Sequence, residues 1–82
     1  MKRVEWTESS LDDMAALDKG IARRVKQAVE RFAETGAGSV KKLQGIDPPE
    51  YRLRVGDFRV RFELDGETVR ILRVRNRREA YR

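Results

Sequence analysis

The sequence predicts an α+β fold in which an N-terminal strand and a two-helix hairpin precede an antiparallel β-meander. In the first half of the chain, apolar residues recur at the spacing that is typical of helices. From Tyr51 onward they alternate with polar residues, which is typical of strands. Two dipeptides of the kind found in hairpin turns, Gly56–Asp57 and Asp65–Gly66, divide this second part. We expect the 82 residues to form a single domain over 1–82.

The chain is expected to begin with a short strand at Val4–Trp6, whose tryptophan packs in the core. Ser9 and Ser10, with aspartates three residues after them, resemble helix N-caps. They predict a first helix that buries Leu11 and Met14.

Asp18 predicts the start of a second, longer helix, because its side chain can accept a hydrogen bond from a free backbone amide. Gly36 is suited to a left-handed cap at the end of this helix. The segment Gly38–Glu50, which contains two consecutive prolines, is interpreted as a loop. The apolar residues of the helix fall on one stripe, formed by Ile21, Val25, Ala28, Val29 and Phe32.

Three strands are predicted at Tyr51–Val55, Phe58–Leu64 and Thr68–Val74. Because side chains alternate between the two faces of a strand, the first two strands have one apolar face, which we expect to pack on the helices. The residues of this face are Leu53, Val55, Phe58, Val60, Phe62 and Leu64.

The two turns predict which side chains face one another on the other side of the sheet. The Gly56–Asp57 turn pairs Arg54 with Arg59 and Arg52 with Arg61. The Asp65–Gly66 turn is expected to pair Arg61 with Arg70, Arg59 with Leu72 and Asp57 with Val74, and to add Asn76 to the same face. Like charges that face each other destabilise a sheet, and a bound anion would relieve the repulsion.

The net charge of +5 is concentrated in the second part of the chain. Residues 1–50 contain nine basic and nine acidic residues, whereas residues 51–82 contain ten arginines, no lysine and five acidic residues. Arginine presents a planar set of donors that matches phosphate. We interpret this half as a site for nucleic-acid phosphate, and a solvated basic surface remains the alternative.

The sequence contains no cysteine and no histidine, and it has no acidic cluster at ligand spacing. We therefore expect no disulfide, no metal site and no cofactor. No apolar run approaches the roughly 20 residues of a membrane span, and the N-terminus has no signal-peptide pattern. The expected location is the cytoplasm, without a membrane partner.

Two segments, YRLRVGDFRVRFEL at 51–64 and VRILRVRNRREAY at 69–81, resemble the C-terminal signature of RelE-type toxins in the RelE/ParE superfamily. The resemblance implies the toxin of a type II toxin–antitoxin pair, with a cognate antitoxin as its partner. RelE-type members cut messenger RNA in the ribosomal A site and so inhibit translation. ParE-type members inhibit DNA gyrase instead. An RNA-binding toxin without nuclease activity is a further alternative.

The resemblance also implies site residues for a metal-independent endoribonuclease (mRNA interferase). The implied catalytic residues are Arg52, Arg54, Arg59, Arg77 and Tyr81. The residues expected to bind RNA are Lys41, Lys42, Arg61, Arg70, Asn76 and Arg78. Many relatives have histidine where this chain has Asn76.

In the metal-free reaction the 2′-OH attacks its own 3′ phosphate, which requires charge stabilisation, a proton acceptor and a proton donor. Arginine is a poor base, so the proton-accepting candidates are Glu63, Glu79, Tyr81 and Tyr51. If the base stands at position 76, Asn76→His should raise the cleavage rate. We further expect Arg54→Ala and Arg59→Ala to abolish growth inhibition and to leave the fold equally or slightly more stable.

Overall fold

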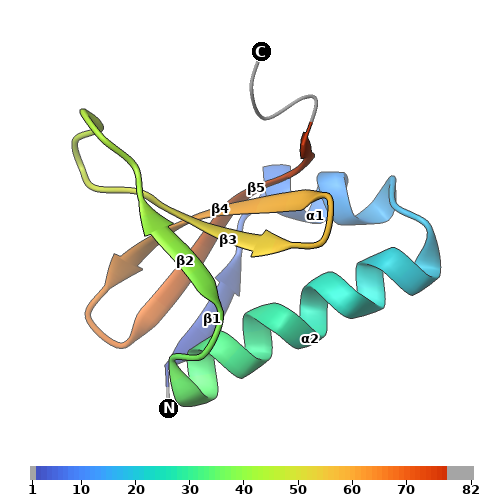
Figure 1. Ribbon diagram of the computed structural model, residues 1–82, viewed down its shortest axis with the longest axis horizontal. Coiled ribbons are helices and arrows are strands. Elements are labelled where there is room, and N and C mark those ends of the chain that lie inside the picture. The colour runs from blue at the N-terminus through green and yellow to red at the C-terminus, as the bar shows by residue number, and fades with distance from the viewer. Residues whose placement is uncertain (1, 78–82) are drawn as a thin grey trace.

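The computed structural model describes residues 2–77, and the predicted α+β fold is confirmed. The described part of the chain contains two helices and five strands (Figure 1). Their order and bounds are β1 (Arg3–Trp6), α1 (Glu8–Ala15), α2 (Lys19–Thr35), β2 (Ser39–Lys42), β3 (Tyr51–Val55), β4 (Phe58–Asp65) and β5 (Thr68–Asn76). No helix within residues 2–77 is long and apolar enough to cross a membrane.

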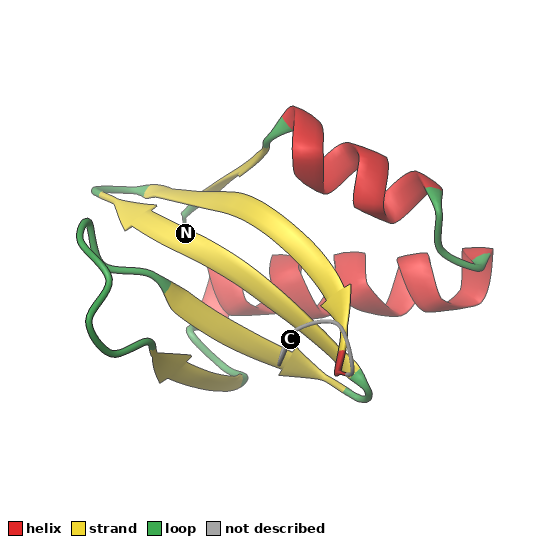
Figure 2. Cartoon of the chain, turned by 90° about the horizontal axis from the view of Figure 1, so that it is seen from above, coloured by secondary structure: helices red, strands yellow, loops and turns green. Residues whose placement is uncertain are grey.

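The strands form one sheet in the order β1-β5-β4-β3-β2, and this sheet is mixed rather than purely antiparallel. The meander of β3, β4 and β5 is antiparallel, as predicted, but β1 pairs with β5 in parallel. A parallel pair requires a long connection. Here the two helices and the other three strands of the sheet supply it. Figure 2 shows both helices on one side of the sheet, so no helix within residues 2–77 covers the opposite face, which we call the uncovered face.

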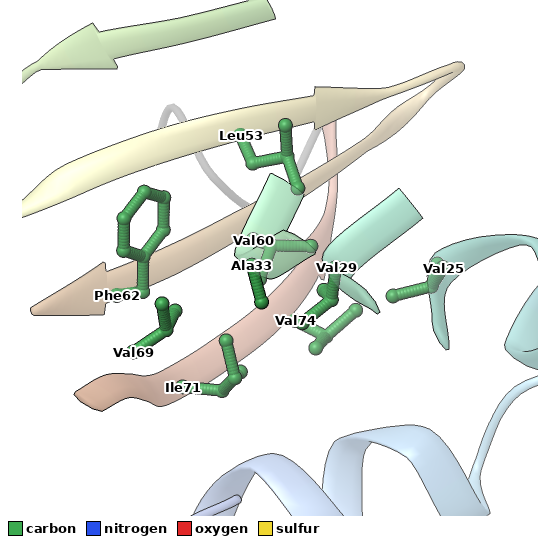
Figure 3. Packing of buried hydrophobic residues seen from close by; sticks show 9 residues of the cluster. All are labelled: Val25, Val29, Ala33, Leu53, Val60, Phe62, Val69, Ile71 and Val74. Carbon is green, nitrogen blue, oxygen red and sulfur yellow. The ribbon is translucent and has the colours of Figure 1, made fainter. Parts of the chain in front are cut away.

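Helix α2 covers the sheet with the apolar stripe that its sequence predicts. Val25 and Val29 are buried, and Ile21, Ala28 and Phe32 pack beside them. The helix begins at the predicted cap, where an Asp18 carboxylate oxygen accepts a hydrogen bond from the Gly20 amide at 3.0 Å. It ends at Gly36, whose φ of 76° is left-handed. Figure 3 shows the core between this helix and the strands, formed by Val25, Val29, Ala33, Leu53, Val60, Phe62, Val69, Ile71 and Val74.

Helix α1 differs from its prediction at its start and on its exposed face. Its N-cap is Thr7, whose side chain accepts from the Ser10 amide, and not Ser9 or Ser10. Ser10 is itself buried, and its hydroxyl donates to the Thr7 carbonyl. Leu11 is 54% exposed, whereas Met14 packs against the core. The start of α1 is anchored by the Thr7 hydroxyl, which donates to the Ile71 carbonyl on β5 at 2.7 Å.

Strand β2 lies within a segment that the sequence predicts to be a loop. All four of its residues are exposed, so no alternation of apolar and polar residues marks it as a strand. It forms because its backbone pairs with β3, with Val40 opposite Leu53. The true loop is shorter and is closed by a hydrogen bond from the Leu43 amide to the Glu50 carbonyl at 2.9 Å.

The second hairpin has a different register from the one predicted. Asp65 pairs with Thr68, so the turn residues are Gly66 and Glu67. A β-bulge then shifts the pairing between Arg61 and Phe62, and Leu72 is the extra residue of β5. The predicted pairs Arg61 with Arg70, Arg59 with Leu72 and Asp57 with Val74 are therefore wrong.

The bulge also changes which residues of β5 face the helices. Val74 was expected on the uncovered face but is 3% exposed and belongs to the core. Asn76 pairs with Phe58, which packs against the core, so position 76 also belongs to the helix-covered face and not to the opposite one. Leu64, predicted in the core, is 38% exposed near the end of its strand.

Candidate nucleic-acid interface

The uncovered face of the sheet carries two rows of basic residues that cross the strands, which we call the arginine face. Paired residues project from the same side of a sheet, and these positions alternate with core residues. The first row is formed by Lys41, Arg52, Arg61 and Arg73. In the second row, Ser39 is followed by Arg54, Arg59 and Arg75. The predicted pairs Arg52 with Arg61 and Arg54 with Arg59 are thus confirmed.

Arg59 is the buried residue of this face, with 4% of its surface exposed. Its Nη1 atom donates hydrogen bonds to the carbonyl oxygens of Gly56 and Phe58, both at 3.0 Å. It forms no ion pair with any residue between 2 and 77. Among the described residues only backbone carbonyls neutralise this buried cation, which is costly. The two hydrogen bonds hold its guanidinium group in one orientation. Arg54, its neighbour on β3, is exposed.

Four arginines of the face line a pocket of about 270 Å³, which we call the arginine pocket. The loop between β2 and β3, drawn in green in Figure 2, forms its other wall with Leu43, Gln44 and Ile46. The arginines are suited to phosphate, and the apolar wall is suited to a base or a sugar. The lining arginines are Arg52, Arg59, Arg61 and Arg75.

Two donors of this pocket have no hydrogen-bond partner within the described part of the chain. They are the buried Nε atoms of Arg61 and Arg75. A buried polar group without a partner costs about 1–3 kcal/mol. Both side chains also line the arginine pocket.

Sequence reasoning missed Glu50, Arg73 and Arg75. Arg75 was missed because its place depends on the bulge. Arg73 occupies the first row, but its Nε and Nη2 atoms donate to the Asp13 carboxylate on α1 at 2.9 and 3.1 Å. The same carboxylate accepts the Val74 amide at 2.8 Å, so α1 covers the edge of β5 beyond β1. Glu50 lies at the end of the loop, where its Oε1 accepts from Arg61 Nη2 at 2.6 Å.

Arg70, expected to bind RNA, lies outside the arginine pocket in a cluster of acidic residues. Its guanidinium group contacts Asp65 and Glu5, both at 3.3 Å, and Glu63 at 3.6 Å. Hydrogen bonds to Asp65 and Glu5 raise the pKa of Arg70 above its ordinary value. Its charge is therefore balanced by carboxylates, whereas Arg59 has no carboxylate partner in the described part of the chain.

The remaining predicted residues are spread around the arginine face. Lys41 belongs to the first row, whereas Lys42 pairs with Tyr51 and so lies on the other side of β2. Tyr51 stacks on Phe62, with ring centroids 5.6 Å apart, and is separated from the arginines by the sheet. Arg77 is exposed at the end of β5, and its amide donates to the Asp57 carbonyl. Arg78, Glu79 and Tyr81 lie outside the described residues.

Comparison with known proteins identifies the family. A family model described as "ParE toxin of type II toxin-antitoxin system, parDE" matches residues 4–81. The chain belongs to this family. The curated protein Toxin RelE3 of Methanocaldococcus jannaschii is 26% identical over 84 residues, which cover 96% of this chain and 94% of the relative. The predicted toxin of the RelE/ParE superfamily, from a type II toxin–antitoxin system, is thereby confirmed.

Solved structures show the same fold. The toxin is similar to a chain of the RelB-RelE antitoxin-toxin complex from Methanococcus jannaschii, with a TM-score of 0.77, 25% identity and coverage of 94% of each chain. A chain of the archaeal RelE-RelB complex from Pyrococcus horikoshii OT3 gives a TM-score of 0.77 at 24% identity, over 93% of this toxin and 94% of that chain.

Proposed function

We propose that this toxin is a ribosome-dependent mRNA endonuclease that acts without a metal ion in the cytoplasm. The observation that carries the proposal is the arginine pocket, because it combines four arginine side chains with an apolar wall. Such a pocket is suited to one phosphate of a single-stranded RNA and to the nucleoside beside it.

The arrangement supports cleavage as well as binding. When the 2′-OH attacks the adjacent phosphorus, negative charge develops on the phosphorane oxygens. Arg59 is buried and already oriented by the carbonyls of Gly56 and Phe58, so it stabilises this charge without reorganising. Arg52, Arg61 and Arg75 surround the same volume. Removal of one such donor typically costs about 10²–10³-fold in rate.

A cognate antitoxin is the proposed protein partner, since the similar solved chains are in complexes of RelE with RelB. The arginine face is the surface that we expect an acidic antitoxin segment to cover. Its carboxylates would take the place of RNA phosphates and would keep the toxin inactive. Co-purification of the toxin with the product of an adjacent gene tests this partner.

The test of the nuclease is single-turnover cleavage of messenger RNA on programmed ribosomes. Wild-type toxin should cut in the A site, and Arg75→Met should be slower by about 10²-fold or more. Arg70→Met is the matched control, because Arg70 is paired with acids outside the pocket and its loss should leave cleavage unchanged. Absence of cleavage by the wild type at every codon tried would overturn the proposal.

Inhibition of DNA gyrase is the second candidate, and the observation that favours it is the ParE description of the matching family model. The arginine face would then contact DNA phosphate or acidic residues of gyrase. A supercoiling assay with purified gyrase separates the two functions. Gyrase inhibition together with intact messenger RNA would establish this candidate instead.

A further inference from the structure

One carboxylate is held at the border of the arginine pocket. Glu50 is the last residue of the loop that walls the pocket, and its side chain is 17% exposed. Its Oε1 accepts a hydrogen bond of 2.6 Å from Nη2 of Arg61, which lines the pocket. The Glu50 carbonyl also accepts the Leu43 amide at 2.9 Å, which closes the loop. Backbone and side chain are therefore both anchored.

The proposed cleavage requires a group that removes the proton of the 2′-OH, and the other described candidates are engaged elsewhere. Tyr51 stacks on Phe62 on the opposite face of the sheet. Glu63 contacts Arg70, outside the pocket. Asp13 is occupied by Arg73 and by the Val74 amide on the far edge of β5. Among the ion pairs of residues 2–77, the one that joins a carboxylate to a lining arginine is that of Glu50.

We infer that Glu50 is the general base of the toxin, a role that rests on the proposed nuclease function. Glu50 takes the proton of the 2′-OH while the 2′ oxygen forms a bond to phosphorus. The bond from phosphorus to the 5′ oxygen breaks, and this oxygen leaves with a proton from water. The products are a 2′,3′-cyclic phosphate and a 5′-OH. Oε1 is held by Arg61, whereas Oε2 makes no hydrogen bond within the described residues and can accept the proton.

The ion pair with Arg61 couples proton transfer to charge stabilisation. Before the reaction, Glu50 neutralises part of the Arg61 charge across 2.6 Å. As Glu50 gains the proton, this attraction falls, and the Arg61 guanidinium becomes available to the phosphorane oxygens that gain charge at the same moment. Glu50 thereby loses its negative charge in the same step in which the phosphate gains one, and Arg61 contacts both groups.

Glu50→Gln tests the inference, because glutamine keeps the size of the side chain and a hydrogen bond to Arg61 but cannot take the proton. We expect the single-turnover rate on programmed ribosomes to fall by about 10²–10⁴-fold, which is the usual contribution of a general base. Binding of the ribosome should be equal or tighter, since a negative charge is lost. Glu34→Gln is the matched control and should cleave at the wild-type rate, because Glu34 is exposed on α2, which packs on the other side of the sheet.

The pH profile separates a base from a structural ion pair. The charged groups facing Glu50 are Arg61, Arg52 and Lys41 and, by continuation of the register of β3 with β4 beyond the pair of Tyr51 and Phe62, the carboxylate of Glu63. The wild-type rate should fall as the Glu50 carboxylate is protonated at low pH, and Glu50→Gln should lack this fall. Glu50→Asp keeps a carboxylate and should keep both the fall and part of the rate, which also covers a Glu50→Gln variant that fails to fold.

Four results would overturn the inference. A Glu50→Gln rate within a few fold of the wild type shows that another group takes the proton. An unchanged acid limb in Glu50→Gln, or an acid limb lost in Glu50→Asp, shows the same. If the wild type itself cuts no messenger RNA, the proposed function fails and the general base fails with it. The wild-type reaction alone therefore shows whether the nuclease function fails or only the role of Glu50.

Discussion

Replacement of Arg59 by alanine tests whether the buried guanidinium group stabilises the fold or strains it. The alternation of the strands makes Arg59 and Arg54 equivalent partners across β3 and β4, and both substitutions would then relieve repulsion. In the structure they differ, because Arg59 is 4% exposed and donates to two backbone carbonyls at 3.0 Å, whereas Arg54 is exposed. The two variants should therefore respond differently.

The expected size of the effect follows from two opposing contributions. Hydrogen bonds from a charged donor contribute about 1.5–3 kcal/mol each, and Arg59→Ala removes two of them. Relief of repulsion from Arg54 and Arg75 on the neighbouring strands returns about 0.2–1 kcal/mol per pair. We expect a net loss of about 3 kcal/mol, which lowers the Tm of a domain of this size by roughly 12–24 °C. Arg54→Ala should stay within about 0.5 kcal/mol of the wild type.

The assay is thermal unfolding followed by circular dichroism, combined with growth inhibition on expression in cells. Both variants should lose toxicity, but only Arg59→Ala should lose stability. Arg54→Ala is the control, since it removes the same charge from the same row. A Tm of Arg59→Ala equal to or above that of the wild type would refute the reasoning, because repulsion would then outweigh the carbonyl hydrogen bonds.

Three further predictions follow from the pocket, the α1 contact and the corrected register. Phosphate at ten times its Kd should stabilise the wild type by about 1.4 kcal/mol in thermal melts at constant ionic strength, and Arg75→Met should lose most of this stabilisation. Equal stabilisation of both proteins would contradict phosphate binding in the arginine pocket. Asp13→Asn weakens contacts to Arg73 and the Val74 amide, so urea unfolding should show a loss of about 1–3 kcal/mol. Asn76→His should not accelerate cleavage, because position 76 pairs with Phe58, and a tenfold faster rate would contradict the register.

Local patterns were sufficient for the elements whose structure depends on neighbours in the chain. The period of α2 and its caps at Asp18 and Gly36 follow from contacts within a few residues, and all were confirmed. The same holds for the first hairpin, because the two-residue turn at Gly56 determines the register of β3 and β4. The superfamily could be named for a similar reason, since its signature lies along these strands and the matched family model spans them.

Tertiary structure decided the features that depend on distant segments. Strand β2 exists because β3 offers an edge to pair with, and its four exposed residues carry no strand pattern. The parallel pairing of β1 with β5 joins the two ends of the described chain. The bulge at Leu72 lies where Thr7 and Asp13 of the α1 region bind the edge of β5. A single inserted residue moves every later side chain of the strand to the opposite face of the sheet. For this reason the prediction placed Val74 and Asn76 on the wrong face.

Some features of the candidate site likewise follow from the sequence, and others depend on the folded structure. That arginines of β3 and β4 share one face follows from alternation alone, and the sequence was enough to predict it. Alternation does not predict which of these arginines are buried or paired with an acid, because Arg54 and Arg59 have the same sequence pattern but opposite exposure. Arg75 lines the pocket because the bulge turns its side chain to this face. Glu50 contacts Arg61 because the loop between β2 and β3 brings it beside the pocket. Burial and charge pairing arise from segments brought together in space, so only the folded chain determines them.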